Sequence, residues 1–162
     1  MKLLRAFKSI FIGIPVGVTI FDTIGYVARV DGVSMQPTLN PDDSPSSDII
    51  FLNRLAVRSY NLHRGDIVSL ISPKDSTQRL VKRVVGLEGD VIYTKRYKKP
   101  MVRIPKGQCW IEGDNSERSM DSNEFGPVAL GLITAKASRI IWPPHRWQKL
   151  SETENPRGLF IY

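Results

Sequence analysis

Short apolar runs separated by turn residues follow Arg29 and limit the folds open to this chain. They are rich in β-branched and aromatic side chains, and no stretch between them has a helical period. Turn residues such as Arg64-Gly65-Asp66 and Gly126-Pro127 separate them. The runs are Ile49–Leu52, Ile67–Ile71, Arg79–Val85, Val91–Thr94, Met101–Ile104, Cys109–Glu112 and Ile133–Trp142. This pattern predicts one mainly β domain over residues 29–150.

Composition excludes several other classes of protein. The chain has 162 residues, the usual size of one domain, and 41% hydrophobic and 24% charged residues, which excludes wholesale disorder. The net charge of +7 permits an anionic membrane surface, nucleic acid or an acidic partner. No nucleic acid partner is expected, because no recognised binding module accompanies the charge. A single cysteine and two histidines exclude a disulfide framework and argue against a metal site, so we expect neither metal nor cofactor.

The stretch Ser9–Ala28 holds twenty residues with a single charge, Asp22. As a helix it would span ~30 Å, about the thickness of a bilayer core. Basic residues in segment 1–8 precede it, as in a chain whose N-terminus stays on the cytoplasmic or matrix side. The pattern predicts one N-terminal transmembrane helix over residues 9–28.

Two alternatives to a retained anchor remain open. A cleaved signal peptide would fit the basic start, although no A-x-A-like cleavage site lies near residue 28. A buried core helix would accommodate Asp22 better, because a carboxylate at the bilayer centre costs ~3 kcal/mol. At the other end, the proline-rich stretch from Trp142 is expected to fray towards Tyr162, with a C-terminal tail over residues 151–162.

Polar groups gather in three segments: Gly32–Thr38, Lys82–Asp90 and Gly113–Asn123. Each alone has a plain structural explanation, such as a turn, a solvated strand or a hairpin. However, Lys82 lies inside the apolar strand R-L-V-K-R-V-V, where alternation places it and Arg83 on opposite faces. One of the two must therefore face the side that the domain buries.

A buried lysine loses its proton more easily than an exposed one. Its neutral amine can then act as a general base towards a serine hydroxyl, without histidine or metal. The scarcity of histidine and cysteine in this chain fits such a Ser-Lys pair.

The order S-M-x-P-T, K-R-V-x-G-x-x-G-D and G-D-N-x-x-x-S-x-D-S, behind an apolar segment, resembles the type I signal peptidase family. The resemblance covers nearly the whole chain to about Leu150. The short length and the ending W-P-P-x-R-W-Q-K-L look closest to the subunit 2 type of the mitochondrial inner membrane proteases. The resemblance implies a signal-peptidase-like β domain of antiparallel sheets behind one transmembrane helix.

The resemblance also implies residue roles. Ser34 matches the nucleophile and Lys82 the general base. Ser119 matches the serine that hydrogen-bonds the lysine amine, and Asp121 matches an acidic residue that supports this geometry. The backbone N–H of Ser34 is expected to stabilise the oxyanion.

This sequence departs from the family pattern at two positions. Asn123 stands where the partner of Asp121 is often an arginine, which puts that salt bridge in doubt. Gly32 stands where many bacterial relatives carry a hydroxyl that helps to stabilise the oxyanion.

The implied function is a membrane-bound serine endopeptidase that removes apolar sorting peptides from preproteins delivered to the mitochondrial intermembrane space. It would be a single-pass protein of the inner membrane, in contact with lipid, with its catalytic domain facing that space. The resemblance implies a heterodimer with the related subunit 1. One alternative is a non-catalytic scaffold subunit that stabilises a catalytic partner. Another, a self-cleaving repressor with the same chemistry, would need a DNA-binding domain where residues 1–33 offer an apolar segment.

Other conspicuous residues have structural explanations. Cys109 is expected to be a core thiol and His63 a loop side chain. Asn40–Asp48 is expected to form a polar surface loop. The basic residues between Lys95 and Lys106 predict a solvated hairpin, with contact to anionic headgroups as the functional alternative.

Overall fold

A computed structural model describes residues 13–14, 17–19, 23–41, 46–59 and 61–150. Its strands are β1 Gly25–Arg29, β2 Ile49–Asn53, β3 Ile67–Ile71, β4 Arg79–Gly86, β5 Val91–Tyr93, β6 Met101–Arg103, β7 Gln108–Glu112, β8 Val128–Ala129, β9 Ile133–Trp142 and β10 Gln148–Lys149. Residues 13–14, 17–19 and 23–24 are helical, and the remaining helices are single turns: α2 Leu55–Arg58, α3 Ser122–Phe125, η1 Leu130–Leu132 and η2 Pro144–Arg146. All seven strands expected from the sequence are present, with ends within one residue of the prediction.

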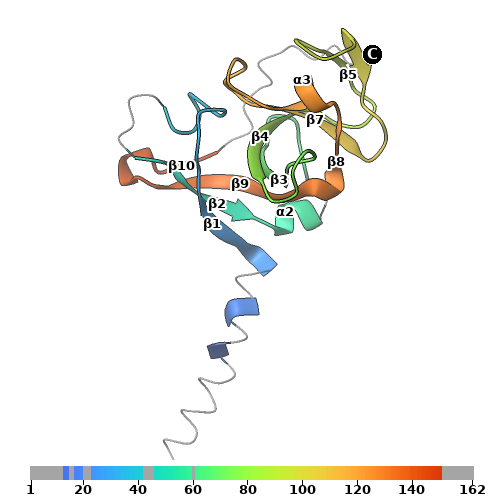
Figure 1. The fold of residues 1–162 in the computed structure, drawn as a ribbon. Helices are drawn as coiled ribbons and strands as arrows, with labels where there is room; N and C mark the ends of the chain where they lie inside the picture. The colour runs from blue at the N-terminus through green and yellow to red at the C-terminus, as the bar shows by residue number, and fades with distance from the viewer. Residues whose placement is uncertain (1–12, 15–16, 20–22, 42–45, 60, 151–162) are drawn as a thin grey trace, which may run out of the picture.

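The sheet is antiparallel throughout and is organised around one long strand. The strand order is β1-β2-β9-β3-β4-β7-β8, and β10 also pairs with β9. Strand β9 therefore joins the strands that follow the N-terminal segment to those that carry the second and third motifs (Figure 1). The prediction of a mainly β domain is confirmed.

The core has three parts, and one of them holds the first motif in place. Met35 and Leu39 are buried among Ile50, Leu52 and side chains of β9. Their burial removes apolar area worth ~2 kcal/mol per side chain from water. The loop that carries Ser34 is thus anchored to the sheet by the residues on either side of Pro37.

Strand β1 corrects one boundary of the predicted membrane anchor. Residues Gly25–Ala28 belong to β1, where Gly25 pairs with Asn53 and Ala28 with Ile50. An apolar run suits a strand as well as a helix, so periodicity did not show the change. The described residues contain no helix that is long and apolar enough to cross a membrane. Much of the predicted anchor, all of segment 1–8 and the predicted tail 151–162 lie outside the described residues.

Two segments near the surface are held by a buried charge. The side chain of Asp48, at the end of the predicted polar loop, is completely buried, which corrects that prediction. The stretch after Trp142 is ordered up to Leu150, since it forms η2 and then β10, which pairs with β9, and the predicted fraying towards Tyr162 lies outside the described residues. The buried carboxylate explains this order, because it requires a charged partner from elsewhere in the chain.

The basic hairpin lies far from the N-terminal end of the domain. Strands β5 and β6 pair only with each other and stand at the opposite end from β1 (Figure 1). The hairpin therefore stands apart from the strand with which the sheet begins.

Candidate active site

Ser34 lies in a tight loop between β1 and β2. Gln36 N–H donates to the Val33 carbonyl at 3.2 Å, and Leu39 N–H donates to the Met35 carbonyl at 2.9 Å. These turns leave Met35 and Leu39 pointing into the core. Ser34 itself is half-buried.

Lys82 reaches Ser34 from the middle of β4. It pairs with Val68 of β3, and its side chain is only 3% exposed. Its Nζ lies 2.6 Å from Ser34 Oγ, although 48 residues separate the two in sequence. The structure therefore brings the predicted nucleophile and the predicted base within hydrogen-bond distance.

Burial of the Lys82 amine lowers its pKa from the ordinary lysine value. The cause is desolvation, which disfavours the ammonium form. The negative charges of Asp121 and Asp114 oppose this effect and raise the pKa, but they do not cancel it. The neutral amine that a general base requires therefore forms at a lower pH here than at an exposed lysine.

Both members of the Lys82-Arg83 pair are buried, whereas the strand pattern required only one. Arg83 is buried on the other face by a bidentate ion pair with Asp114, at 2.8 and 2.6 Å. It also donates to the Gly65 carbonyl at 2.7 Å. Such a fork fixes both position and angle, so Arg83 fastens the third motif to β4.

The third motif also contacts the first directly. Asn115 N–H donates to the Ser34 carbonyl at 3.1 Å. Between them lies Gly113, where an added Cβ would overlap the Ser34 carbonyl and Ser119 Oγ. A glycine is required here by close approach, and the backbone of the nucleophile loop is packed against the G-D-N segment.

Ser119 is buried beside Gly113, but its hydroxyl has no hydrogen-bond partner among the described residues. The expected hydrogen bond to the Lys82 amine is therefore not made in this structure.

Asp121 caps α3 from a fully buried position. Its carboxylate accepts from Gly113 N–H at 3.0 Å and from Asn123 N–H at 3.0 Å. It thus holds Gly113, the residue packed against Ser34, and its charge acts on Lys82 as described above.

Asn123 takes the place of the arginine partner that Asp121 often has. Its side-chain amide donates to Asp121 at 3.1 Å and to Glu112 at 3.0 Å, and its oxygen accepts from Lys95 N–H at 2.9 Å. Hydrogen bonds from a neutral amide to two carboxylates therefore stand in place of the salt bridge.

A cleft of about 280 Å³ opens beside the dyad. Apolar side chains from β1, β2 and β4 line much of it, and Ser34, Lys82 and Arg79 are also part of its lining. Gly32 borders the same cleft, and an added Cβ at Gly32 would meet no atom within 4 Å. The missing hydroxyl at this position thus leaves open space.

The other singled-out side chains lie away from this cleft. Cys109 is fully buried in the core, where desolvation raises the pKa of its thiol to about 12. His63 lies in the turn before β3, and its backbone N–H donates to Asp66 at 2.8 Å. Within the described parts of the chain, no three His, Cys, Asp or Glu side chains gather as metal ligands would.

Sequence reasoning missed the partners that hold the dyad. Arg83 was noticed only as the neighbour of Lys82, and Asp114 and Asn115 only as parts of a G-D-N turn. The signal available was the charge pair itself, since an arginine inside an apolar strand needs a carboxylate.

Comparison with known proteins places these motifs in one family. The model of the family described as "Signal peptidase, peptidase S26" matches residues 3–98 and 93–142. Mitochondrial inner membrane protease subunit 2 of Danio rerio is 54% identical over 94% of this chain and 84% of its own length. The human protein of that name is 51% identical over 98% and 91%.

Human mitochondrial inner membrane protease subunit 1 is more distant, at 40% identity over 76% of this chain and 73% of its own length. Similarity is thus higher to the human subunit 2 than to the human subunit 1, as the length and the C-terminal motif indicate. The chain belongs to the S26 family of signal peptidases.

Proposed function

We propose that this chain is a membrane-bound serine endopeptidase in which Ser34 is the nucleophile and Lys82 the general base. The distance of 2.6 Å between Ser34 Oγ and Lys82 Nζ carries the proposal. Burial of Lys82 and its lowered pKa support it, because only a neutral amine can accept the serine proton.

The proposed reaction has two steps. Lys82 takes the proton of Ser34 as Oγ attacks the scissile carbonyl, and the resulting ammonium gives that proton to the leaving amine. A water molecule, deprotonated by Lys82 in turn, then attacks the acyl carbonyl, and Lys82 returns the proton to Ser34 Oγ as the acyl group leaves. The backbone N–H of Ser34 stabilises the oxyanion in both steps, a contribution of ~3 kcal/mol for one donor.

The substrates proposed are preproteins with apolar sorting peptides. The apolar lining of the cleft beside the dyad supports this choice, since it can bury small apolar side chains next to the cleaved bond.

The inner mitochondrial membrane is the proposed location, with the domain in the intermembrane space. Relatives named as mitochondrial inner membrane protease subunits support the membrane. The apolar residues before Gly25 would form a single span. This span would end before Gly25 and not at Ala28, because β1 begins at Gly25. A nucleophile nine residues beyond Gly25 can lie at most ~30 Å from the end of that span. A substrate held by its own apolar segment would present its cleavage site near that height.

We further propose a heterodimer with a subunit 1 protein. Relatives of this chain carry both subunit names, and subunit 1 shares the family fold at 40% identity. The alternative is a scaffold that stabilises subunit 1 without cutting any substrate itself. The intact Ser34–Lys82 contact favours the enzyme.

Comparison of mature protein N-termini in cells tests the proposal. Cells carry the wild-type chain, Ser34→Ala, or the control Ser59→Ala, whose serine lies on the exposed end of α2. If the chain is an enzyme, a set of preproteins should stay uncut in cells with Ser34→Ala and be cut normally in cells with Ser59→Ala. Normal processing with Ser34→Ala, together with its loss when the whole chain is deleted, would identify a scaffold instead.

A further inference from the structure

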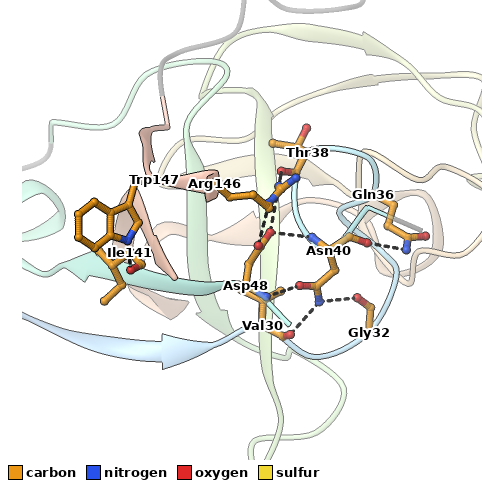
Figure 2. A network of polar contacts seen from close by, with 9 residues as sticks. All are labelled: Val30, Gly32, Gln36, Thr38, Asn40, Asp48, Ile141, Arg146 and Trp147. Carbon is orange, nitrogen blue, oxygen red and sulfur yellow. Dashed lines mark hydrogen bonds and ion pairs between the residues drawn. The ribbon is translucent and has the colours of Figure 1, made fainter. Parts of the chain in front are cut away.

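The segment after β9 is fastened to the nucleophile loop by a buried ion pair. Arg146 of η2 donates to both oxygens of the Asp48 carboxylate, at 2.9 and 3.0 Å, although 98 residues separate the two. The same guanidinium donates to the Thr38 carbonyl at 3.0 Å. Figure 2 shows this fork lying between Asp48 and Thr38.

Asp48 in turn holds Asn40. Its second oxygen accepts from Asn40 N–H at 2.8 Å, while Asn40 Oδ1 accepts from Asp48 N–H at 2.7 Å. Asn40 has a φ of 51°, in the left-handed region that asparagine tolerates better than most other residues. The reciprocal bonds fix this residue at the point where the nucleophile loop ends.

Asn40 then closes the loop onto its beginning. Its side-chain amide donates to the Val30 carbonyl at 2.7 Å and to the Gly32 carbonyl at 3.2 Å (Figure 2). Its own carbonyl accepts from the Gln36 side chain at 2.6 Å. Gly32 lies two residues before Ser34, so the contacts reach the backbone that carries the nucleophile.

We propose that Asn40, Asp48 and Arg146 form a clamp that positions Ser34 for the reaction. None of the three reaches the cleft beside the dyad, so each acts through the backbone of residues 30–40. The clamp assigns a role to the W-P-P-x-R ending, because this segment places Arg146 beside the buried Asp48. The expected effect on cleavage rests on the function proposed above.

Thr38, in the nucleophile loop, contacts two arginines that are distant from it in sequence. Its carbonyl accepts from Arg146, and its hydroxyl lies 3.3 Å from the guanidinium of Arg83, which also holds Asp114. The nucleophile loop is therefore held between two arginines, one from the strand that carries Lys82 and one from η2. A small shift of this loop would move Ser34 away from Lys82.

Three variants of the full chain test the clamp. Arg146→Lys keeps the charge beside Asp48 but loses the fork. The double variant Asp48→Asn with Arg146→Met removes both charges, so neither is left buried and unpaired. Asn40→Gly keeps the left-handed backbone accessible and removes only the side-chain contacts. The control is Arg64→Ala, which removes a similar fork on Asp90, at 2.8 Å, outside residues 30–40.

Hydrogen exchange of residues 30–40, in the detergent-solubilised full chain, reports the loop without any reference to catalysis. We expect exchange roughly tenfold faster in the double variant and in Asn40→Gly than in wild type, with Arg146→Lys between. The control should match wild type. A thermal unfolding scan confirms that each variant is folded.

Steady-state cleavage supplies the second measurement. The probe is a peptide that spans a site whose cutting in cells requires Ser34. We expect kcat to fall by about 100-fold in the double variant with KM nearly unchanged, because a misplaced nucleophile slows the reaction rather than binding. Arg146→Lys should recover part of that loss.

Either measurement can overturn the clamp. Wild-type exchange in the folded double variant would show that the three residues do not hold the loop. Faster exchange with an unchanged kcat would show that the loop does not position Ser34. If no cellular cleavage depends on Ser34, the proposed function fails, and the exchange measurement alone decides whether the clamp exists.

Discussion

Gly113→Ala is the substitution to which the arrangement of the site is most sensitive. An added Cβ at Gly113 would overlap the Ser34 carbonyl, Ser119 Oγ and Ser119 Cβ. Two of these atoms belong to the buried Ser119 side chain and one to the backbone of the nucleophile loop, so none can move away freely. The φ of Gly113 lies outside the left-handed region, and the effect of the substitution is therefore purely steric.

The magnitude follows from this overlap. Overpacking at a buried position costs about 1–3 kcal/mol of folding free energy. In a chain of this size each 1 kcal/mol lowers Tm by roughly 4 °C, so the expected decrease is about 4–12 °C. A shift of Ser34 by about 1 Å should lower kcat about 100-fold, which corresponds to about 2.7 kcal/mol of activation free energy.

Gly131→Ala is the matched control. Gly131 lies in η1, its φ is also outside the left-handed region, and an added Cβ would meet no atom within 4 Å. Its effect on stability should stay within about 0.5 kcal/mol, with kcat unchanged. Thermal unfolding and steady-state cleavage by the two purified variants provide the comparison. If Gly113→Ala is as stable and as active as Gly131→Ala, the packing of the third motif against Ser34 is wrong.

Three further predictions concern buried polar groups. Asn123→Ala should lower stability in urea by about 2–3 kcal/mol, because Asp121 and Glu112 each lose a buried donor; an unchanged midpoint would contradict the network. Lys82→Met should abolish cleavage yet raise Tm at neutral pH. The folded chain binds fewer protons at Lys82 than the unfolded chain, so wild-type stability rises with pH between the lowered and the ordinary pKa, and the advantage of Lys82→Met should vanish over that range. Cys109 should resist iodoacetamide at pH 8 until urea unfolds the chain, because its pKa is raised to about 12; labelling of the folded protein would show that this thiol is exposed.

The strands were predictable because their signals are local. Alternation and turn residues define each run within a few positions, and the seven expected strands match the structure closely. The strands missed were β1 and the two-residue strands β8 and β10, and β1 lies in an apolar run that fits helix and strand equally well. The strand that pairs with β1 is β2, which lies beyond the nucleophile loop, so no local pattern could show this pairing.

The pair of reacting groups was partly predictable, because a lysine inside an apolar strand needs an explanation. The ion pairs that hold Ser34 and Lys82 in place were not predictable. The partner of Arg83 is Asp114, 31 residues away, and the partner of Asp48 is Arg146, 98 residues away. A charged residue in a loop or tail is usually solvated, and only the fold shows that these are buried together.

The central claim is that burial lowers the pKa of the Lys82 amine and that its neutral form takes the proton of Ser34. The most direct measurement is the titration of Lys82 in the folded protein by NMR of ¹³C-labelled lysine, alongside the pH dependence of kcat/KM. Lys82→Met identifies the resonance. We predict that the amine titrates below the ordinary lysine range and that activity falls on the acid side with the same midpoint. Titration of Lys82 in the ordinary range, or an acid limb with a different midpoint, would contradict the claim.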